Sequence, residues 1–195
     1  MKISKFLPLS LLLVFLVCLA APAVPARQMM PGAGMSPAGP GGELVQVQVL
    51  PSREGFAAGG TYPLALSLTI GKGFHINSTQ PSDPHLIPTR LSFQAPEGIT
   101  LSRPIFPRPR KMRVGFLDKP AEFFGGRVLV RTSINIDAGL APGRYQVTGR
   151  LSYQACNNQM CMMPQEVSFA IPVSVAPAGR SGRRLHPEFF GRADK

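Results

Sequence analysis

Apolar and polar residues alternate along six stretches of this chain. The stretches are 44-LVQVQVL-50, 62-YPLALSLTI-70, 89-TRLSFQA-95, 127-RVLVRTSINI-136, 144-RYQVTGRLSYQ-154 and 166-EVSFAIPVSV-175. Successive side chains of a β-strand point to opposite faces, so a period of two predicts a strand with one buried face. Turn residues separate the stretches, at 59-GG-60, 96-PEG-98 and 142-PG-143, and a further short strand is expected near 99-ITLS-102.

Seven or eight short strands without a convincing helical stretch predict an all-β fold. The 195 residues include 20 Gly and 21 Pro, which favours strands joined by turns over long helices. Such a series of strands predicts an antiparallel β-sandwich of immunoglobulin-like type. The antibody signature of two distant cysteines around a buried Trp is missing, because the chain contains no Trp. The pattern therefore predicts the class of fold and leaves the strand order open.

The first 26 residues have the pattern of a secretory signal peptide. Lys2 and Lys5 precede the apolar run 9-LSLLLVFLVCLAA-21, and small residues then allow cleavage after Ala26 or Ala23. We therefore expect export, or membrane anchoring through this segment where it stays uncleaved. The mature chain should be a flexible linker over 27–42, a sandwich domain over 43–176 and a basic, disordered tail over 177–195.

Two long connections interrupt the predicted strands, at 71–88 and 103–126. Connections of this length in a compact sandwich are usually functional or disordered. Both contain aromatic residues, which a disordered linker would not need. We therefore expect them to contribute to a functional site.

The chain is strongly basic, with a formal net charge of +11. Much of this charge lies in 103-RPIFPRPRKMR-113 and in 180-RSGRR-184. Export and the lack of a basic motif interleaved with aromatic residues argue against nucleic acid as a partner. A solvated basic surface, or contact with anionic lipid or cell wall, fits the charge better.

Two cysteines remain after export, since Cys18 lies in the signal segment. Cys156 and Cys161 fall in a loop that joins the predicted strands 144–154 and 166–175. A single pair in an oxidising compartment should form a disulfide, which needs Cα atoms about 4.4–6.8 Å apart. Closing so short a loop stabilises the fold by only about 2 kcal/mol. A structural bond and an exchangeable bond are therefore both open.

Metal binding is the other chemistry to weigh at this loop. Zinc needs more ligands than two cysteines, and His75 and His85 could join them only if the first long connection folds over the pair. Copper(I) suits soft sulfur ligands, and three methionines surround Cys161, at Met160, Met162 and Met163. Those methionines would equally serve as adaptable packing or as a contact surface. No metal or cofactor is expected, and no spacing indicates a hydrolytic cysteine nucleophile.

Three segments together resemble the N-terminal domain of the thiol:disulfide interchange protein DsbD family. They are 151-LSYQACNNQMCMMPQEVSF-169, 73-GFHINSTQPSDPHLIPTRLSF-93 and 122-EFFGG-126. The resemblance covers residues 43–176, and the loop with its two cysteines is its specific part. It implies an immunoglobulin-like domain in the periplasm that exchanges thiols and disulfides, as a protein-disulfide reductase if it acts as an enzyme.

The resemblance also implies partners. A thioredoxin-like protein, supplied through a membrane electron transporter, would donate electrons. Oxidised periplasmic proteins, including disulfide isomerases and cytochrome c maturation factors, would accept them. The alternative is a periplasmic binding module, for copper(I) or a protein client, with a purely structural disulfide.

The resemblance assigns roles to particular residues. Cys161 would form the mixed disulfide with partners, and Cys156 would resolve it. A flexible cap loop over the pair would match Glu122, Phe123, Phe124 and Gly125, with Phe123 as the lid. The residues that flank the cysteine pair in the matching segments are Tyr153, Gln154, Pro164, Phe74 and His75.

Overall fold

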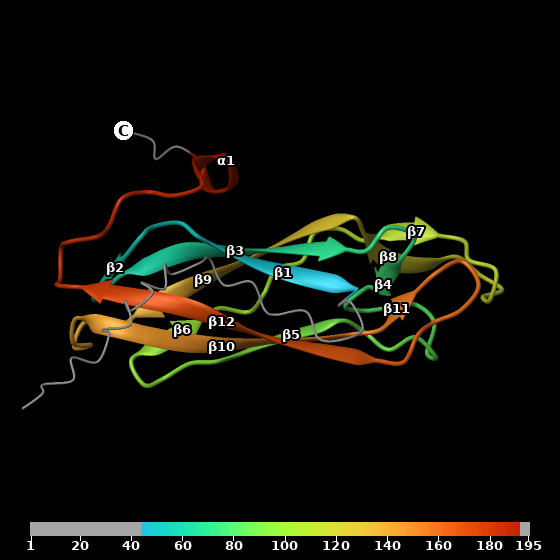
Figure 1. Cartoon of the computed structure of the whole chain (residues 1–195), viewed down its shortest axis with the longest axis horizontal. Coiled ribbons are helices and arrows are strands. Elements are labelled where there is room, and N and C mark those ends of the chain that lie inside the picture. The colour runs from blue at the N-terminus through green and yellow to red at the C-terminus, as the bar shows by residue number, and fades with distance from the viewer. Residues whose placement is uncertain (1–43, 192–195) are drawn as a thin grey trace, which may run out of the picture. The chain divides into compact units, whose positions relative to one another are not determined.

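The computed structural model describes residues 44–191, and β-strands dominate them (Figure 1). The strands are β1 (Val45–Pro51), β2 (Phe56–Ala57), β3 (Thr61–Ile70), β4 (His75–Asn77), β5 (Arg90–Gln94), β6 (Ile99–Leu101), β7 (Arg110–Met112), β8 (Ala121–Gly125), β9 (Arg127–Ile136), β10 (Gly143–Tyr153), β11 (Ala155–Cys156) and β12 (Gln165–Ala176). A single turn of helix, α1 (Pro187–Phe190), follows.

Two four-stranded sheets form a sandwich. One has the order β1-β3-β9-β6 and the other the order β2-β12-β10-β5. Neighbouring strands are antiparallel, except that the short β2 pairs in parallel with the end of β12. The structure therefore confirms the predicted all-β, immunoglobulin-like sandwich.

The core lies between these sheets and follows the alternation in the sequence. Every second residue of β9 and of β12 is buried. One core cluster contains Leu66 and Val130 from the first sheet and Leu151 and Ile171 from the second. Burying these side chains removes apolar surface from water, which is the main favourable contribution to folding.

The six strands expected from the alternation and the short one expected near 99–102 are all present, with their ends shifted by at most one residue. The sequence pattern did not predict five further strands, because each has only two to five residues. A strand that short completes too few alternations for its period to stand out. Four of the five form a third sheet, with the order β11-β4-β8-β7.

This third sheet is built from the two long connections and the cysteine loop. Figure 1 shows β4, β7, β8 and β11 gathered at one end of the sandwich and β2 at the other. The last residue of β3 lies next to the third sheet, because the amide of Ile70 donates to the carbonyl of Gly126, between β8 and β9. The long connections therefore contain strand structure of their own, and these strands lie at one end of the domain.

The C-terminal segment differs from the expected disordered tail between residues 177 and 191. Its backbone pairs with the chain after β1: Glu54 donates to the carbonyl of Arg183, and Leu185 donates to the carbonyl of Ser52. A side-chain ion pair joins Arg183 to Glu54. The basic composition of this segment suggested disorder. The backbone groups of Ser52 and Glu54 and the Glu54 carboxylate nevertheless give it partners on the sandwich.

The predicted signal peptide (1–26), the linker (27–42) and the last four residues lie outside the described part of the chain. Between residues 44 and 191, no helix is long and apolar enough to cross a membrane.

Candidate functional site

Cys156 and Cys161 form a disulfide at the end of the third sheet, with an S–S distance of 2.00 Å. The two residues also face each other as an isolated antiparallel bridge. Hydrogen bonds flank them on both sides, from the amide of Asn157 to the carbonyl of Met160 and from the amide of Met162 to the carbonyl of Ala155. Such a pair, between two hydrogen-bonded pairs, holds its Cα atoms close together.

The pair differs from expectation in one respect, because its Cα atoms are 3.9 Å apart, closer than the expected range. The first cysteine lies in β11, which leaves the sheet of β10 and pairs with β4 in the third sheet. β10 and β12 do pair as neighbours, up to Tyr153 opposite Gln165, so the loop joins adjacent strands as predicted.

The turn between the cysteines is held by Asn157. Its side-chain oxygen accepts hydrogen bonds from the amides of Gln159 (2.8 Å) and Met160 (2.9 Å). Asn commonly stabilises turns in this way, by binding backbone donors two and three residues further on. The turn therefore fixes Cys161 opposite Cys156 through local contacts.

The two sulfurs differ in access. Cys156 is completely buried, whereas Cys161 is partly exposed. Thiol–disulfide exchange requires an attacking thiolate to reach a sulfur, so access determines which sulfur reacts. An approaching protein would meet Cys161 first.

One face of the third sheet forms the surroundings of Cys156. His75 pairs directly opposite Cys156, and Asn77 pairs opposite Phe123. Residues that pair or alternate in this way share a face of a sheet. Ile76, between His75 and Asn77, joins the main core instead.

His75 is buried beside this face, and its Nε2 atom has no hydrogen-bond partner. Its ring makes an edge contact with Phe123, with 4.3 Å between the ring centres. Burial lowers the pKa of His75, because a charged imidazolium loses its hydration there. Near neutral pH the ring is therefore uncharged.

Asn77 is a site residue that sequence reasoning missed. It is completely buried, and its Nδ2 donates to the carbonyl of Ile87 (2.8 Å) and to Oε1 of Gln154 (3.0 Å). These two bonds turn its Oδ1 toward Cys156, 3.6 Å from the Sγ atom. The available signal was the alternation in 73-GFHIN-77, which places Asn77 on the same face as His75.

Gln154 connects this network to the cysteine loop. Its Oε1 accepts from Asn77 and from the amide of Ile87 (3.2 Å), while its Nε2 donates to the carbonyl of Met162 (3.2 Å). Both ends of the side-chain amide are therefore in use. Gln154 is thereby bonded directly to the loop that contains Cys161, through the carbonyl of Met162.

The residues Glu122 to Gly125 lie in strand β8 and not in a loop, which corrects the implied local structure of the cap. Strand β8 pairs with β4 and β7 on its two sides, so its backbone is held at both edges. Phe123 is completely buried, in a small cluster with Leu86, Val114 and Ala121. Cys161 packs against this cluster, so Phe123 does lie beside the disulfide region.

Phe124 and Glu122 point away from Phe123, as alternation requires. Phe124 joins the main core and stacks on Phe106, with 5.4 Å between ring centres. Glu122 accepts a hydrogen bond from the amide of Ser82 (3.2 Å). The side chain of Ser82, and to a lesser extent this backbone bond, lower the pKa of Glu122 below its ordinary value.

A second segment lies against the cysteine turn. In residues 113–117, between β7 and β8, the amide of Gly115 donates to the carbonyl of Asn158 in the cysteine turn (3.0 Å). Phe116 and Leu117 pack against the same cluster as Cys161. We call residues 113–117 the cover segment. The cover segment lies within the long connection 103–126, which was expected to contribute to a functional site.

The remaining predicted residues have varied surroundings. Tyr153 is buried in the main core and donates through its hydroxyl to Gln165 (2.8 Å). Phe74 packs on the edge of the main core, and Pro164 is exposed. Met160 and Met163 are 56% and 81% exposed. Among residues 44–191, no three His, Cys, Asp or Glu side chains gather in a group that could hold a metal ion.

The fold and the site together define a class: an immunoglobulin-like sandwich with a disulfide in a short loop at one end. Residues 46–172 match the family described as "Thiol:disulfide interchange protein DsbD, N-terminal". This chain therefore belongs to the DsbD N-terminal domain family. Membership supports a role in thiol–disulfide exchange. No curated protein sequence matches the chain.

Solved structures include domains with a similar fold. The N-terminal periplasmic domain of ScsB from Proteus mirabilis aligns with a TM-score of 0.50 and 14% identity, over 71% of this chain and 50% of that one. The N-terminal domain of DsbD from Neisseria meningitidis, in its reduced form, aligns with a TM-score of 0.42 and 15% identity, over 66% of this chain and 85% of that one. The chain thus spans half the length of the ScsB chain that it matches.

Proposed function

We propose that this chain is a periplasmic protein that exchanges thiols and disulfides through Cys156 and Cys161. Electrons would come from a thioredoxin-like protein or a membrane electron transporter, and would pass to oxidised periplasmic proteins. The observation that carries the proposal is the unequal exposure of the two sulfurs, in a domain of the DsbD N-terminal family. An accessible sulfur backed by a buried one suits a pair that is attacked and then resolved.

Reduction of the pair would proceed in two steps. A donor thiolate attacks Sγ of Cys161, and the Cys156–Cys161 bond breaks, leaving Cys156 as a thiolate that takes up a proton. The second donor thiol then attacks the donor sulfur of the mixed disulfide and releases Cys161. The donor becomes a disulfide, and this chain gains two electrons and two protons.

Delivery to a client reverses the order. The Cys161 thiolate attacks a client disulfide and forms a mixed disulfide, and one client sulfur leaves as a thiolate. Cys156 loses its proton, attacks Sγ of Cys161 and releases the second client sulfur. The client is reduced, and the Cys156–Cys161 bond forms again.

The surroundings support different roles for the two sulfurs. In the disulfide, Cys156 has no proton to donate to Asn77. After reduction its S–H group can donate to the Oδ1 atom that faces it. A hydrogen bond to the neutral thiol favours that form over the thiolate. Asn77 would therefore keep Cys156 protonated until a mixed disulfide forms at Cys161.

The cover segment and the exposed methionines would control which molecules reach the pair. An apolar cover excludes water and small thiols, and a docking protein can displace it. Met160 and Met163 are exposed next to Cys161, and flexible methionines suit contact with several partners. These features favour protein partners over free thiols.

Trapping tests the proposal. Cys156→Ser leaves a single thiol at Cys161, which should be captured as a stable mixed disulfide by a thioredoxin-like protein with one active-site cysteine. Cys161→Ser leaves the buried thiol and should be captured much less. Equal capture would remove the division of roles, and no capture by either variant would contradict exchange through this pair.

A further inference from the structure

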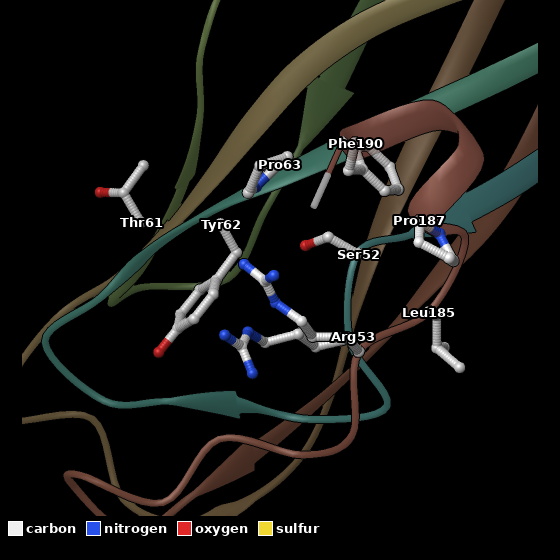
Figure 2. A pocket seen from close by; sticks show the side chains of 10 residues that line it. Ser52, Arg53, Thr61, Tyr62, Pro63, Leu185, Pro187 and Phe190 are labelled. Carbon is white, nitrogen blue, oxygen red and sulfur yellow. The ribbon is translucent and has the colours of Figure 1, made fainter. Parts of the chain in front are cut away.

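The C-terminal segment builds a cavity at the end of the sandwich away from the disulfide (Figures 1 and 2). The cavity has a volume of about 230 Å³. Figure 2 shows its lining: Ser52, Arg53 and Tyr62 come from the sandwich, and Leu185, Pro187 and Phe190 come from the C-terminal segment. The proposed exchange function makes no use of this region.

Two arginines line this cavity directly opposite each other. Arg53 and Arg184 are partners in an antiparallel bridge, so their side chains leave the backbone on the same side. Like charges placed directly opposite are destabilising. The Arg53 guanidinium donates to the carbonyl of Gly182 (3.1 Å) and lies 5.9 Å from the ring centre of Tyr62. Neither contact neutralises its charge.

No carboxylate of the described chain compensates this pair. The ion pairs within residues 44–191 join Arg150 to Glu166 and Arg183 to Glu54, and Glu188 lies 3.4 Å from Nδ1 of His186. The nearest acidic side chain along the chain, Glu54, is thus already engaged by Arg183. Two positive charges therefore face one cavity without an internal counter-ion.

A buried hydroxyl lies at the same cavity. Ser52 is only 7% exposed, and its Oγ atom has no hydrogen-bond partner. Buried polar atoms in folded proteins are nearly always hydrogen-bonded, so an unsatisfied one indicates a missing water, ion or ligand. This observation is independent of the arginine pair and points to the same place.

We propose that the cavity binds a phosphate group through Arg53, Arg184 and Ser52. The guanidinium fork matches phosphate oxygens in paired hydrogen bonds, and a phosphate can carry enough negative charge to offset both arginines. A carboxylate would offset only one of them. The apolar side chains of Leu185, Pro187 and Phe190 suit an organic group attached to the phosphate.

The phosphate could belong to a soluble molecule or to the headgroup of an anionic phospholipid. Binding would then hold the C-terminal segment against the sandwich, because Arg184 belongs to the segment and Ser52 belongs to the sandwich. The cavity is distinct from the cysteine pair, so its ligand need not affect the exchange chemistry.

The test compares four single variants of the full chain: Arg53→Gln, Arg184→Gln, Ser52→Ala and, as a control, Arg144→Gln. Arg144 is an exposed arginine on β10. Two probes are titrated separately, inorganic phosphate and vesicles with or without phosphatidylglycerol. Amide chemical shifts of Ser52 and Tyr62 report phosphate binding at this cavity, and sedimentation reports vesicle binding.

We expect one probe or both to bind, and Arg53→Gln and Arg184→Gln each to weaken that binding about tenfold or more, as expected for a hydrogen bond to a charged group. Ser52→Ala should weaken it less, and Arg144→Gln less than twofold. Binding of inorganic phosphate but not of vesicles indicates a soluble ligand, and binding of vesicles but not of phosphate indicates a lipid headgroup. Absence of saturable binding by both probes, or equal weakening by the Arg144 control, would overturn the site.

Thermal unfolding provides a second readout of the same binding. Without phosphate, Arg184→Gln should be at least as stable as the parent chain, because it removes one of two repelling charges. With phosphate, the parent should gain more stability than the variant, since the gain depends on the ligand concentration relative to the dissociation constant. A variant that is less stable without phosphate and gains as much stability with it as the parent would contradict the proposal.

Discussion

The Oδ1 atom of Asn77 lies 3.6 Å from the Sγ atom of Cys156, and both side chains are completely buried. The carbonyl of Ile87 and Oε1 of Gln154 hold the opposite end of the amide. The orientation of the oxygen is therefore set by the protein and does not depend on the redox state of the sulfur. Only the reduced pair offers it a hydrogen.

This relationship predicts that Asn77 favours the reduced pair with Cys156 protonated. In Asn77→Leu the S–H group loses its acceptor, which is worth about 0.5–1.5 kcal/mol. The equilibrium with glutathione should shift toward the disulfide by roughly 2- to 10-fold. In the Cys161→Ser background, alkylation of Cys156 at neutral pH should become faster. Asn158→Ala, at an exposed position in the cysteine turn, should change neither quantity.

Asn77→Asp separates a direct effect from loss of structure. An acceptor oxygen can still face the sulfur in Asn77→Asp, so alkylation of Cys156 should not become faster in this variant, whereas it should become faster in Asn77→Leu. Both variants lose the amide donors and should be less stable. Parallel changes in alkylation rate would mean that Asn77 only supports the fold.

Phe123→Ala should be strongly destabilising, because the side chain is completely buried in β8. Truncation of a buried Phe costs about 3–5 kcal/mol. The same change should speed reaction of the reduced cysteines with small oxidants, since the cluster beside Cys161 loses its largest member. Phe56→Ala removes a buried ring at the other end of the sandwich and is the control. It should lose stability without a change in oxidation rate.

The cover segment offers the cleaner test of shielding. Phe116 is only partly buried, so Phe116→Ala should lose less stability than Phe123→Ala while still speeding oxidation. Chemical denaturation and the rate of reaction with hydrogen peroxide give the two quantities. An unchanged rate in both Phe116→Ala and Phe123→Ala would remove the shield from the mechanism.

His75 should make stability depend on pH. Burial lowers its pKa in the folded state, so the unfolded chain binds more protons in the window below the ordinary histidine value of about 6.5. Stability from this group is present above that value and is lost as the pH falls toward the lowered pKa. In His75→Gln the free energy of unfolding should change less with pH in that window. His85→Gln, at an exposed position, should leave the slope intact.

The methionines near Cys161 distinguish exchange from copper binding. Met160, Met162 and Met163 changed together to Leu should leave thiol exchange nearly intact, because Leu keeps an apolar contact surface. A copper(I) module would instead bind the ion tightly when reduced and lose that affinity in the triple variant. Stoichiometric copper binding that needs these methionines, without exchange activity, would favour the alternative.

The long strands could be predicted because each has a half-buried face that leaves a period of two in the sequence. The pairing of β10 with β12 also followed, since the cysteine loop joins two such strands. The third sheet could not be found in the same way. Its strands are too short to show a period, and they pair with segments far along the chain, such as Cys156 with His75.

Chemistry and the family resemblance proposed Cys156, Cys161, His75, Gln154 and Phe123 as site residues, and the structure places them in or near the third sheet and the cysteine loop. Asn77 was not among them, because an Asn in a loop is common and only the folded chain turns its oxygen toward a sulfur. The packing of residues 180–185 on the sandwich could not be predicted either, because a basic composition says nothing about unpaired backbone groups near Ser52.

The reduction potential of the Cys156–Cys161 pair tests the central claim most directly. The mature chain is equilibrated in glutathione buffers of known ratio, and free thiols are alkylated and counted by mass. An exchange protein should show a potential of roughly −180 to −270 mV. A potential well below about −300 mV would mark a bond that resists reduction, and would contradict the account by making the disulfide structural.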